Sequence, residues 1–140
     1  MSEASAPKLT FAGPEWIAAA REILQDLTTR HGQPGDRFSL CERFTDAPPD
    51  IASSGVAAWY FRIDGASAEV GPGEIADADA TVTGDYVETL PVARQVYTPE
   101  ILAERKAKRE RGELKAQQGD WSRAPRYLSE LHNRLAVLTA

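Results

Sequence analysis

Apolar and polar residues alternate through the middle of the chain, as they do in strands of a sheet that is buried on one side. The alternation is clearest over 56–63 and stops at Asp64-Gly65, a pair that suits the positive backbone dihedral angles of a tight hairpin turn. Residues 66–71 therefore predict the returning strand of a hairpin. The same alternation predicts two more strands, over 38–45 and over 78–84.

A different periodicity, with apolar residues every three or four positions, predicts helices towards both ends of the chain. The first helix begins at Gly13-Pro14 and ends at Gly32, and two shorter helices begin after the capping residues Asp85 and Thr98. The last helix is predicted to begin after Ser122. Its apolar stripe comprises Ala124, Tyr127, Leu128, Leu131, Leu135 and Leu138.

These elements predict a single layer of sheet with four to five strands, covered by helices. The order is α-β-β-β-β-α-α-(β)-α, in which the bracketed fifth strand is a short segment at 113–117. Residues 1–12 are predicted to form a flexible leader and residues 13–140 a single domain. The proline-rich loop 46–55 is expected at one end of the sheet, and Gly71-Pro72-Gly73 is interpreted as a corner.

Composition narrows the range of functions. The chain has 140 residues, 42% of them hydrophobic, and a formal net charge of -5, which is typical of a soluble globular protein and argues against nucleic-acid binding. The lone Cys41 cannot form an intramolecular disulfide and the N-terminus has no signal-peptide pattern, so a cytoplasmic location is expected. No apolar run is long enough to span a membrane.

No motif for catalysis or for metal binding stands out. Cys41 and the two histidines form no pattern of a nucleophile with a base, so Cys41 is interpreted as a strand residue packed in the core. Asp77, Asp79 and Asp85 are a weak signal for calcium, and solvated charges at a sheet edge explain them better. No catalytic residue, metal site or cofactor is predicted.

Positive charge is concentrated in residues 105–115, which hold six basic and two acidic side chains. The candidate patch for an anionic membrane surface or a partner comprises Arg105, Lys106, Lys108, Arg109 and Arg111. The alternative is a solvated helix whose charges pair along its surface, for instance Glu104 with Lys108.

Three segments resemble the sterol carrier protein 2 domain family. They are the hairpin WYFRIDGASAEVGPG, the following ADATVTGDYVETL, and GELKAQQGDWSRAPRYLSELHNRL near the C-terminus. The resemblance implies an α+β fold with a single mixed sheet of up to five strands and with helices packed on one face. It also implies no catalytic residues and a hydrophobic tunnel for fatty acyl chains, sterols or similar molecules. The tunnel-facing positions would be Trp59, Phe61, Tyr127, Leu128, Leu131 and Leu135. The long charged segment 97–111 and the glutamines at 117 and 118 depart from the family pattern.

The sequence favours a non-catalytic carrier that binds a hydrophobic small molecule in an internal apolar cavity. One alternative is an accessory domain that contacts a protein and has a core filled by its own side chains. A less favoured alternative is a small enzyme acting on an apolar substrate. Such an enzyme would need a buried carboxylate with a raised pKa, and Asp64 and Glu69 are the acids of the central hairpin.

Overall fold

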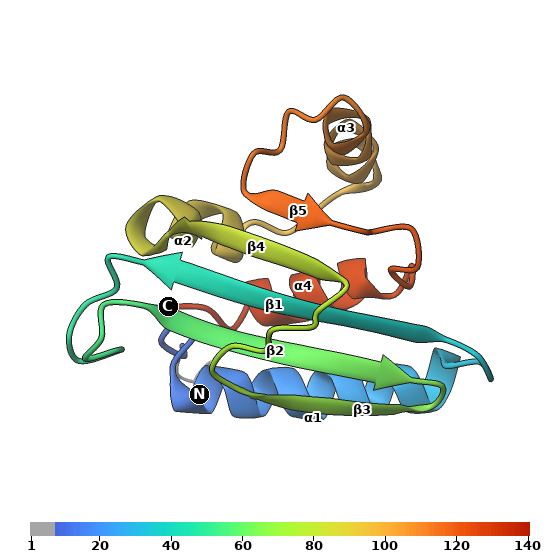
Figure 1. Cartoon of the computed structure of the whole chain (residues 1–140), viewed down its shortest axis with the longest axis horizontal. Helices are drawn as coiled ribbons and strands as arrows, with labels where there is room; N and C mark the ends of the chain where they lie inside the picture. Colours follow the sequence, from blue (N-terminus) through green and yellow to red (C-terminus); the bar gives the residue numbers. More distant parts are fainter. Residues whose placement is uncertain (1–7) are drawn as a thin grey trace, which may run out of the picture.

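In the computed structural model, which describes residues 8–140, helices cover one side of a mixed sheet (Figure 1). The elements are α1 (Pro14–His31), β1 (Arg37–Thr45), β2 (Ala57–Asp64), β3 (Ser67–Pro72), β4 (Ala80–Asp85), α2 (Tyr86–Arg94), α3 (Pro99–Glu110), β5 (Gln117–Gly119) and α4 (Leu128–Ala136). They follow the predicted order, and the bracketed fifth strand is formed. The predicted α+β fold with a single mixed sheet is confirmed.

The sheet has the strand order β3-β2-β1-β4-β5, so β1 lies at its centre. β1 pairs antiparallel with β2 and parallel with β4, and the two outer pairs are antiparallel. Buried and less buried residues alternate along β2, because every second side chain faces the helices. The register places Trp59, Glu42, Val82 and Gln117 in one row across the sheet.

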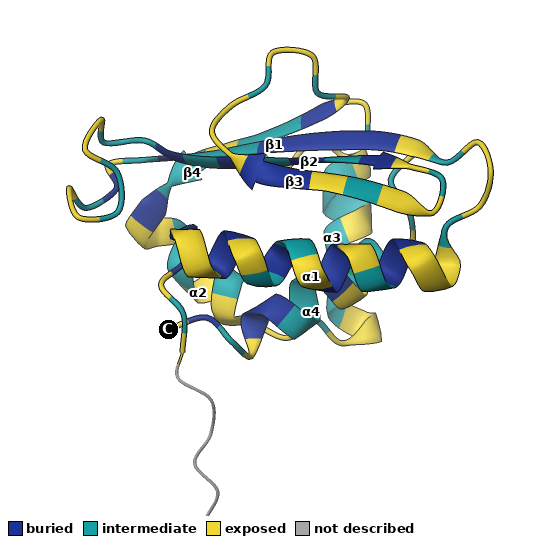
Figure 2. Ribbon diagram, turned by 90° about the horizontal axis from the view of Figure 1, so that it is seen from below, coloured by how far each residue is buried: buried dark blue, intermediate teal, exposed yellow. Residues whose placement is uncertain are grey.

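The helices differ in how closely they approach the sheet. α1 packs along β3 and buries one face, on which Trp16, Ile17, Ala20, Ile23, Leu24 and Leu27 recur at helical spacing. α4 packs on α1 and α2, and Figure 2 shows it further from the sheet than α1. α3 has no buried residue and lies beyond β5, apart from the other helices (Figure 1).

Capping side chains explain where α2 and α3 begin. The Glu88 N–H donates a hydrogen bond of 2.9 Å to the side chain of Asp85, and the Ile101 N–H donates one of 3.2 Å to Thr98. Each bond satisfies a backbone donor that has no partner inside the helix. Both starts agree with the sequence prediction. Pro91 lies inside α2 without ending it.

Two predicted boundaries are wrong. α4 begins at Leu128 rather than after Ser122, because Pro125 lacks an N–H and disfavours helical backbone at the residue before it. Residues 121–128 instead form two successive turns, closed by hydrogen bonds from Ala124 to Trp121 and from Leu128 to Pro125. The fifth strand pairs with β4 through Gln117–Gly119, two to four positions later than predicted.

The predicted flexible leader is wrong for residues 8–12. Leu9 forms a parallel bridge with Thr139, and Phe11 is only 4% exposed. The Phe11 ring packs against Trp16 with centroids 5.2 Å apart, and the Tyr86 hydroxyl donates to the Phe11 carbonyl at 2.6 Å. This segment is therefore part of the core. The first seven residues of the predicted leader lie outside those that the structure describes.

Candidate functional site

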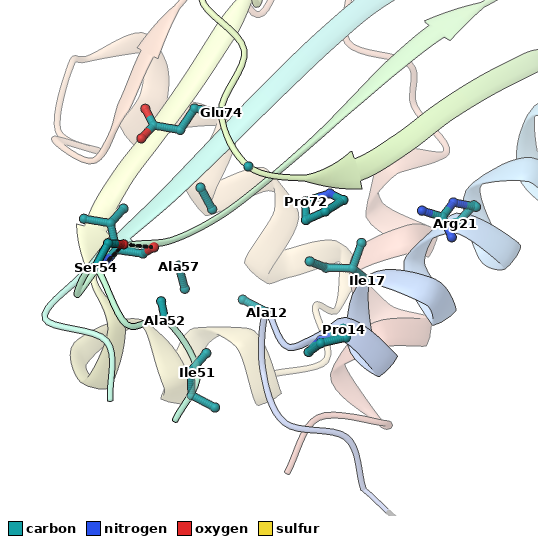
Figure 3. Close-up of a pocket in the computed structure, with 13 residues that line it drawn as sticks. Ala12, Pro14, Ile17, Arg21, Ile51, Ala52, Ser54, Ala57, Pro72 and Glu74 are labelled. Carbon is teal, nitrogen blue, oxygen red and sulfur yellow. Dashed lines mark hydrogen bonds between the residues drawn. The ribbon is translucent and has the colours of Figure 1, made fainter. Parts of the chain in front are cut away.

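An apolar groove opens at the end of the sheet where β2 begins and β3 ends (Figure 3). It has a volume of about 580 Å³ and lies between the first turns of α1, the loop before β2 and the corner after β3. Small or apolar side chains form most of its walls, including Ile17, Ile51, Ala52, Val56, Ala57 and Pro72. We refer to it as the end groove.

Two backbone features shape the end groove. The loop after β1 closes on itself, because the Ala47 N–H donates to the Gly55 carbonyl at 2.9 Å and Gly55 adopts a φ of 85° that favours glycine. Gly73, with a φ of 92°, turns the chain after β3. The proline-rich loop and the Gly-Pro-Gly corner, which the sequence predicts separately, thus meet at one end of the sheet.

The polar side chains at the rim of the end groove are already paired within the protein. Arg21 donates two hydrogen bonds, of 3.1 and 2.8 Å, to the Val70 carbonyl. Arg43 forms an ion pair with Glu74 at 2.7 Å. Because these groups have partners, apolar contact is the main attraction that the groove offers to a ligand.

The predicted tunnel residues belong to the core or lie against it. They are Trp59, Phe61, Tyr127, Leu128, Leu131 and Leu135. The two aromatic residues of β2 are 3% and 1% exposed, and Trp59 packs edge to face on Trp16 with ring centroids 5.1 Å apart. Leu131 and Leu135 are buried, whereas Tyr127 and Leu128 are half-buried at the start of α4. None of the six lines the end groove.

A carboxylate that the sequence analysis did not single out lies beside these core residues. Glu42 is on the helix-facing side of β1, and the Trp59 Nε1–H donates to its Oε1 at 2.7 Å. Burial raises the pKa of Glu42 to about 7, and the hydrogen bond from Trp59 opposes this only in part. The sequence did contain a signal for Glu42, because it occupies the same every-second-residue positions as the apolar Phe38, Leu40 and Phe44.

Tyr97, between α2 and α3, is held in place by α4. Its N–H donates to the Asn133 side chain at 2.7 Å, and that side chain donates to the Tyr97 carbonyl at 3.1 Å. The Tyr97 ring stacks on His132 with centroids 3.8 Å apart, and the Arg105 guanidinium lies 4.9 Å from the Tyr97 ring. Burial raises the pKa of Tyr97 and lowers that of His132, so His132 is neutral at pH 7.

Two arginines of the basic segment face the body of the protein. Arg105 contacts the ring of Tyr97, as described above. Arg109 donates to the Gln117 side chain at 2.6 Å and lies 5.1 Å from the centre of the Trp121 ring. These two side chains attach α3 to the rest of the molecule and are not part of an outward-facing patch.

The other basic side chains of the predicted patch lie on α3 or directly after it, and none of them is buried. Lys108 pairs with Glu104 at 3.5 Å, as the solvated-helix alternative predicts. Arg111 pairs with Glu113 at 2.7 Å, and Lys106 is exposed. Positive charge is therefore partly balanced along this surface, which makes it a smaller patch than the sequence indicates.

The remaining candidate residues have structural partners. Cys41 is 2% exposed within β1. Asp77 pairs with an arginine of β2 at 3.1 Å, Asp79 accepts a hydrogen bond of 2.8 Å from the Ser39 N–H, and Asp85 caps α2. Within residues 8–140, no three potential ligand side chains are grouped so as to hold a metal ion. None of the helices described there has the length and apolar character needed to cross a membrane.

Comparison with solved structures defines the fold. A crystal structure of sterol carrier protein 2 matches with a TM-score of 0.62 and 16% sequence identity, covering 92% of this chain and 99% of that one. The chain has the sterol carrier protein 2 fold. This fold is shared by a conserved hypothetical protein from Thermus thermophilus, described as a candidate sterol carrier protein, with a TM-score of 0.52 and 11% identity over 96% of each chain.

A third structure, of the ubiquinone synthesis protein UbiJ-SCP2, has a TM-score of 0.49 and 18% identity, and covers 91% of this chain and 96% of that one. No protein-family model matches the sequence, and no curated protein matches it significantly. The fold that the three sequence segments indicate is confirmed by the crystal structure of sterol carrier protein 2 and by the order of the elements.

Proposed function

We propose that the protein is a non-catalytic carrier that binds a hydrophobic small molecule in the end groove. The groove itself carries the proposal, because its volume of about 580 Å³ is within the range of small-molecule sites and its walls are mainly apolar. The fold supports the proposal, since a solved protein with this fold is a sterol carrier protein. The proposed ligand is a lipid, a fatty acyl chain, a sterol or a similar molecule.

Affinity would come from burial of apolar surface. A ligand that hides roughly 300 Å² of apolar area gains on the order of 7 kcal/mol, at about 25 cal/mol per Å². Loss of translational and rotational freedom offsets part of this gain. We therefore expect dissociation constants in the micromolar range or weaker.

Filling the end groove tests the proposal directly. Ala52→Phe places an aromatic ring in the groove, and we expect it to weaken binding of fatty acids, sterols or quinones at least about tenfold. Binding can be followed by tryptophan fluorescence, because Trp16 and Trp59 adjoin the groove residues Ile17 and Ala58. Mass spectrometry of gently purified wild type should also reveal a co-purifying apolar molecule.

A matched substitution controls for the added ring. Ala103→Phe makes the same change at an exposed position of α3, and this variant should bind like the wild type. If both variants bind alike, or if the wild type binds no apolar molecule, the end groove is not a carrier site and an accessory interaction domain is favoured. An enzyme would be established by turnover that depends on Glu42, since Asp64 and Glu69 are exposed.

We further propose that α3 brings this carrier to an anionic membrane surface in the cytoplasm. Exposed Lys106 and Lys115 support the proposal. The side chains of Lys108 and Arg111 support it too, because exposed ion pairs contribute little and can be exchanged for lipid phosphates.

A further inference from the structure

A second cavity lies at the other end of α1 from the end groove. It has a volume of about 620 Å³ and opens between His31, the last residue of α1, Asp36 before β1, the two turns that precede α4 and the first turn of α4. We refer to it as the turn cavity. In contrast to the end groove, most of its lining residues are polar. A ligand of the turn cavity is therefore selected by hydrogen bonds and charge.

Two arginines that line the turn cavity have no partner in the described part of the chain. Arg123 lies in the first of the two turns and Arg126 in the second, and both are exposed. The side chain of neither forms a hydrogen bond or an ion pair with another described residue. Other arginines of this protein do: Arg30, Arg62 and Arg111 each pair with a carboxylate at 2.7 to 3.1 Å. The cavity thus holds two guanidinium groups whose N–H donors are free for a ligand.

The two acids that line the turn cavity are engaged within the protein. Asp36 accepts a hydrogen bond of 2.9 Å from the Gln33 N–H, and Glu130 pairs with Arg134 at 3.5 Å. These two acids equal the two lining arginines in formal charge. Because the acids have partners and the arginines have none among the described residues, the groups available to a ligand are mainly the cationic ones.

Further hydrogen-bond donors lie in the walls of the turn cavity. The rings of His31 and Tyr127 both line it and stack with centroids 6.0 Å apart. The Tyr127 hydroxyl is enclosed and has no hydrogen-bond partner among the described residues. Burial raises the pKa of Tyr127, so the hydroxyl keeps its proton at neutral pH. Ser122 contributes a second hydroxyl. Two cationic groups are therefore combined with neutral donors around one space.

We propose that the turn cavity is a binding site for a phosphate group, either free phosphate or the phosphomonoester end of a lipid-like molecule. A phosphate monoester has three acceptor oxygens and a charge near -2 at neutral pH, so it can accept from Arg123 and Arg126 together. A carboxylate has two oxygens and a single charge. Ala124 and Pro125 offer an apolar wall to an attached chain. This site goes beyond the proposed carrier function, since it selects a ligand by its charge.

Three probes test the site by titration at constant pH and ionic strength: inorganic phosphate, acetate and octyl phosphate. We expect the wild type to bind inorganic phosphate at least about tenfold more tightly than acetate. Octyl phosphate is measured in Ala52→Phe, whose end groove is filled. Tighter binding of octyl phosphate than of inorganic phosphate in that variant assigns the site to a lipid-like molecule, and equal binding assigns it to free phosphate.

Single substitutions locate the phosphate within the protein. Arg123→Gln and Arg126→Gln should each weaken phosphate binding about tenfold, because each removes a charge-assisted hydrogen bond. Both side chains are exposed and unpaired among the described residues, so the fold should survive, as circular dichroism will show. Arg62→Gln is the matched control: it removes the same charge from β2, where Arg62 pairs with Asp77 at 3.1 Å, and it should bind phosphate like the wild type.

The two histidines of the chain give a readout that needs no variant. His31 lines the turn cavity, whereas His132 stacks on Tyr97 and its Nε2 donates to the Gln95 carbonyl at 2.7 Å. In nuclear magnetic resonance spectra, phosphate should shift the ring signals of His31 and leave those of His132 in place.

Three results would overturn the phosphate site. They are no binding of phosphate by the wild type, equal affinity for phosphate and acetate, and a loss of binding in Arg62→Gln as large as that in the two cavity variants. Phosphate binding that is kept in Ala52→Phe supports a site separate from the end groove. Failure of the carrier proposal would therefore leave this site standing, and loss of phosphate binding in Ala52→Phe would overturn it.

Discussion

Ionisation of Glu42 costs the folded protein free energy, because the carboxyl lies beside apolar side chains. Burial raises its pKa from 4.5 to about 7, so the folded state keeps a proton that the unfolded chain releases. Its contribution to stability is therefore most favourable below pH 4.5 and is lost as the pH rises to about 7. We expect Glu42→Gln, which cannot ionise, to gain about 2 kcal/mol in unfolding free energy relative to wild type between about pH 5 and pH 8.

Urea denaturation of the two proteins across this range measures the difference. His132 has the opposite pH dependence, since burial lowers its pKa and its contribution is lost as the pH falls below 6.5. That residue is present in both proteins, so its effect cancels. A constant difference between Glu42→Gln and wild type across the range would mean that water solvates the Glu42 carboxyl fully.

Glu42 also shows how much of the candidate site the sequence pattern predicts. Alternation along the strand correctly assigns Phe38, Leu40 and Phe44 to the buried side, and the same alternation assigns Glu42 to it. The acids of the central hairpin, Asp64 and Glu69, were considered instead, and both are exposed. The alternation of the strand was therefore sufficient to find Glu42, whereas its hydrogen bond to Trp59 depends on the pairing of two strands, which the pattern of one strand does not contain.

α3 is the element best suited to bind a membrane surface, because it carries basic side chains and none of its residues is buried. We expect the protein to sediment with vesicles that contain phosphatidylserine, and Lys106→Glu to reduce this binding about tenfold, since each basic residue near an anionic surface contributes about 1 kcal/mol and reversal removes more. Added salt should weaken the binding. Arg30→Glu, at an exposed end of α1, serves as the control, and equal loss in both variants would contradict a role for α3.

The sequence correctly predicts the helices and strands whose limits are set by residues close by in the chain. Asp85 and Thr98 fix helix starts through bonds to residues three positions away, and strand alternation needs only the strand itself. The predicted start of α4 after Ser122 is wrong, because Pro125 disfavours helical backbone at the residue before it. The end groove could not be predicted as a site, since its walls come from the first turns of α1 and from two loops that only the complete fold brings together.

At the scale of the whole molecule, the two ends of the described chain lie side by side. The Ala140 N–H donates to the Leu9 carbonyl at 2.8 Å, and the Trp16 indole donates to Thr139 at 3.1 Å. The buried Phe11 ring connects this junction to the core under β1, with its centroid 4.7 Å from that of Phe44. Residues near both ends of the described chain thus stabilise the same corner beside the end groove.

The parallel pairing of β1 with β4 has a consequence for how the chain assembles. β1, β2 and β3 join through successive hairpin-like pairings, whereas β4 reaches β1 only after both intervening strands. Closing the larger loop costs more chain entropy, so we expect amides of β2 to gain protection from hydrogen exchange earlier during refolding than those of β4. Simultaneous protection would contradict this order. Until β4 pairs with β1, β1 has an unpaired edge that can bind other partly folded molecules. Refolding yield should therefore fall through aggregation as protein concentration rises.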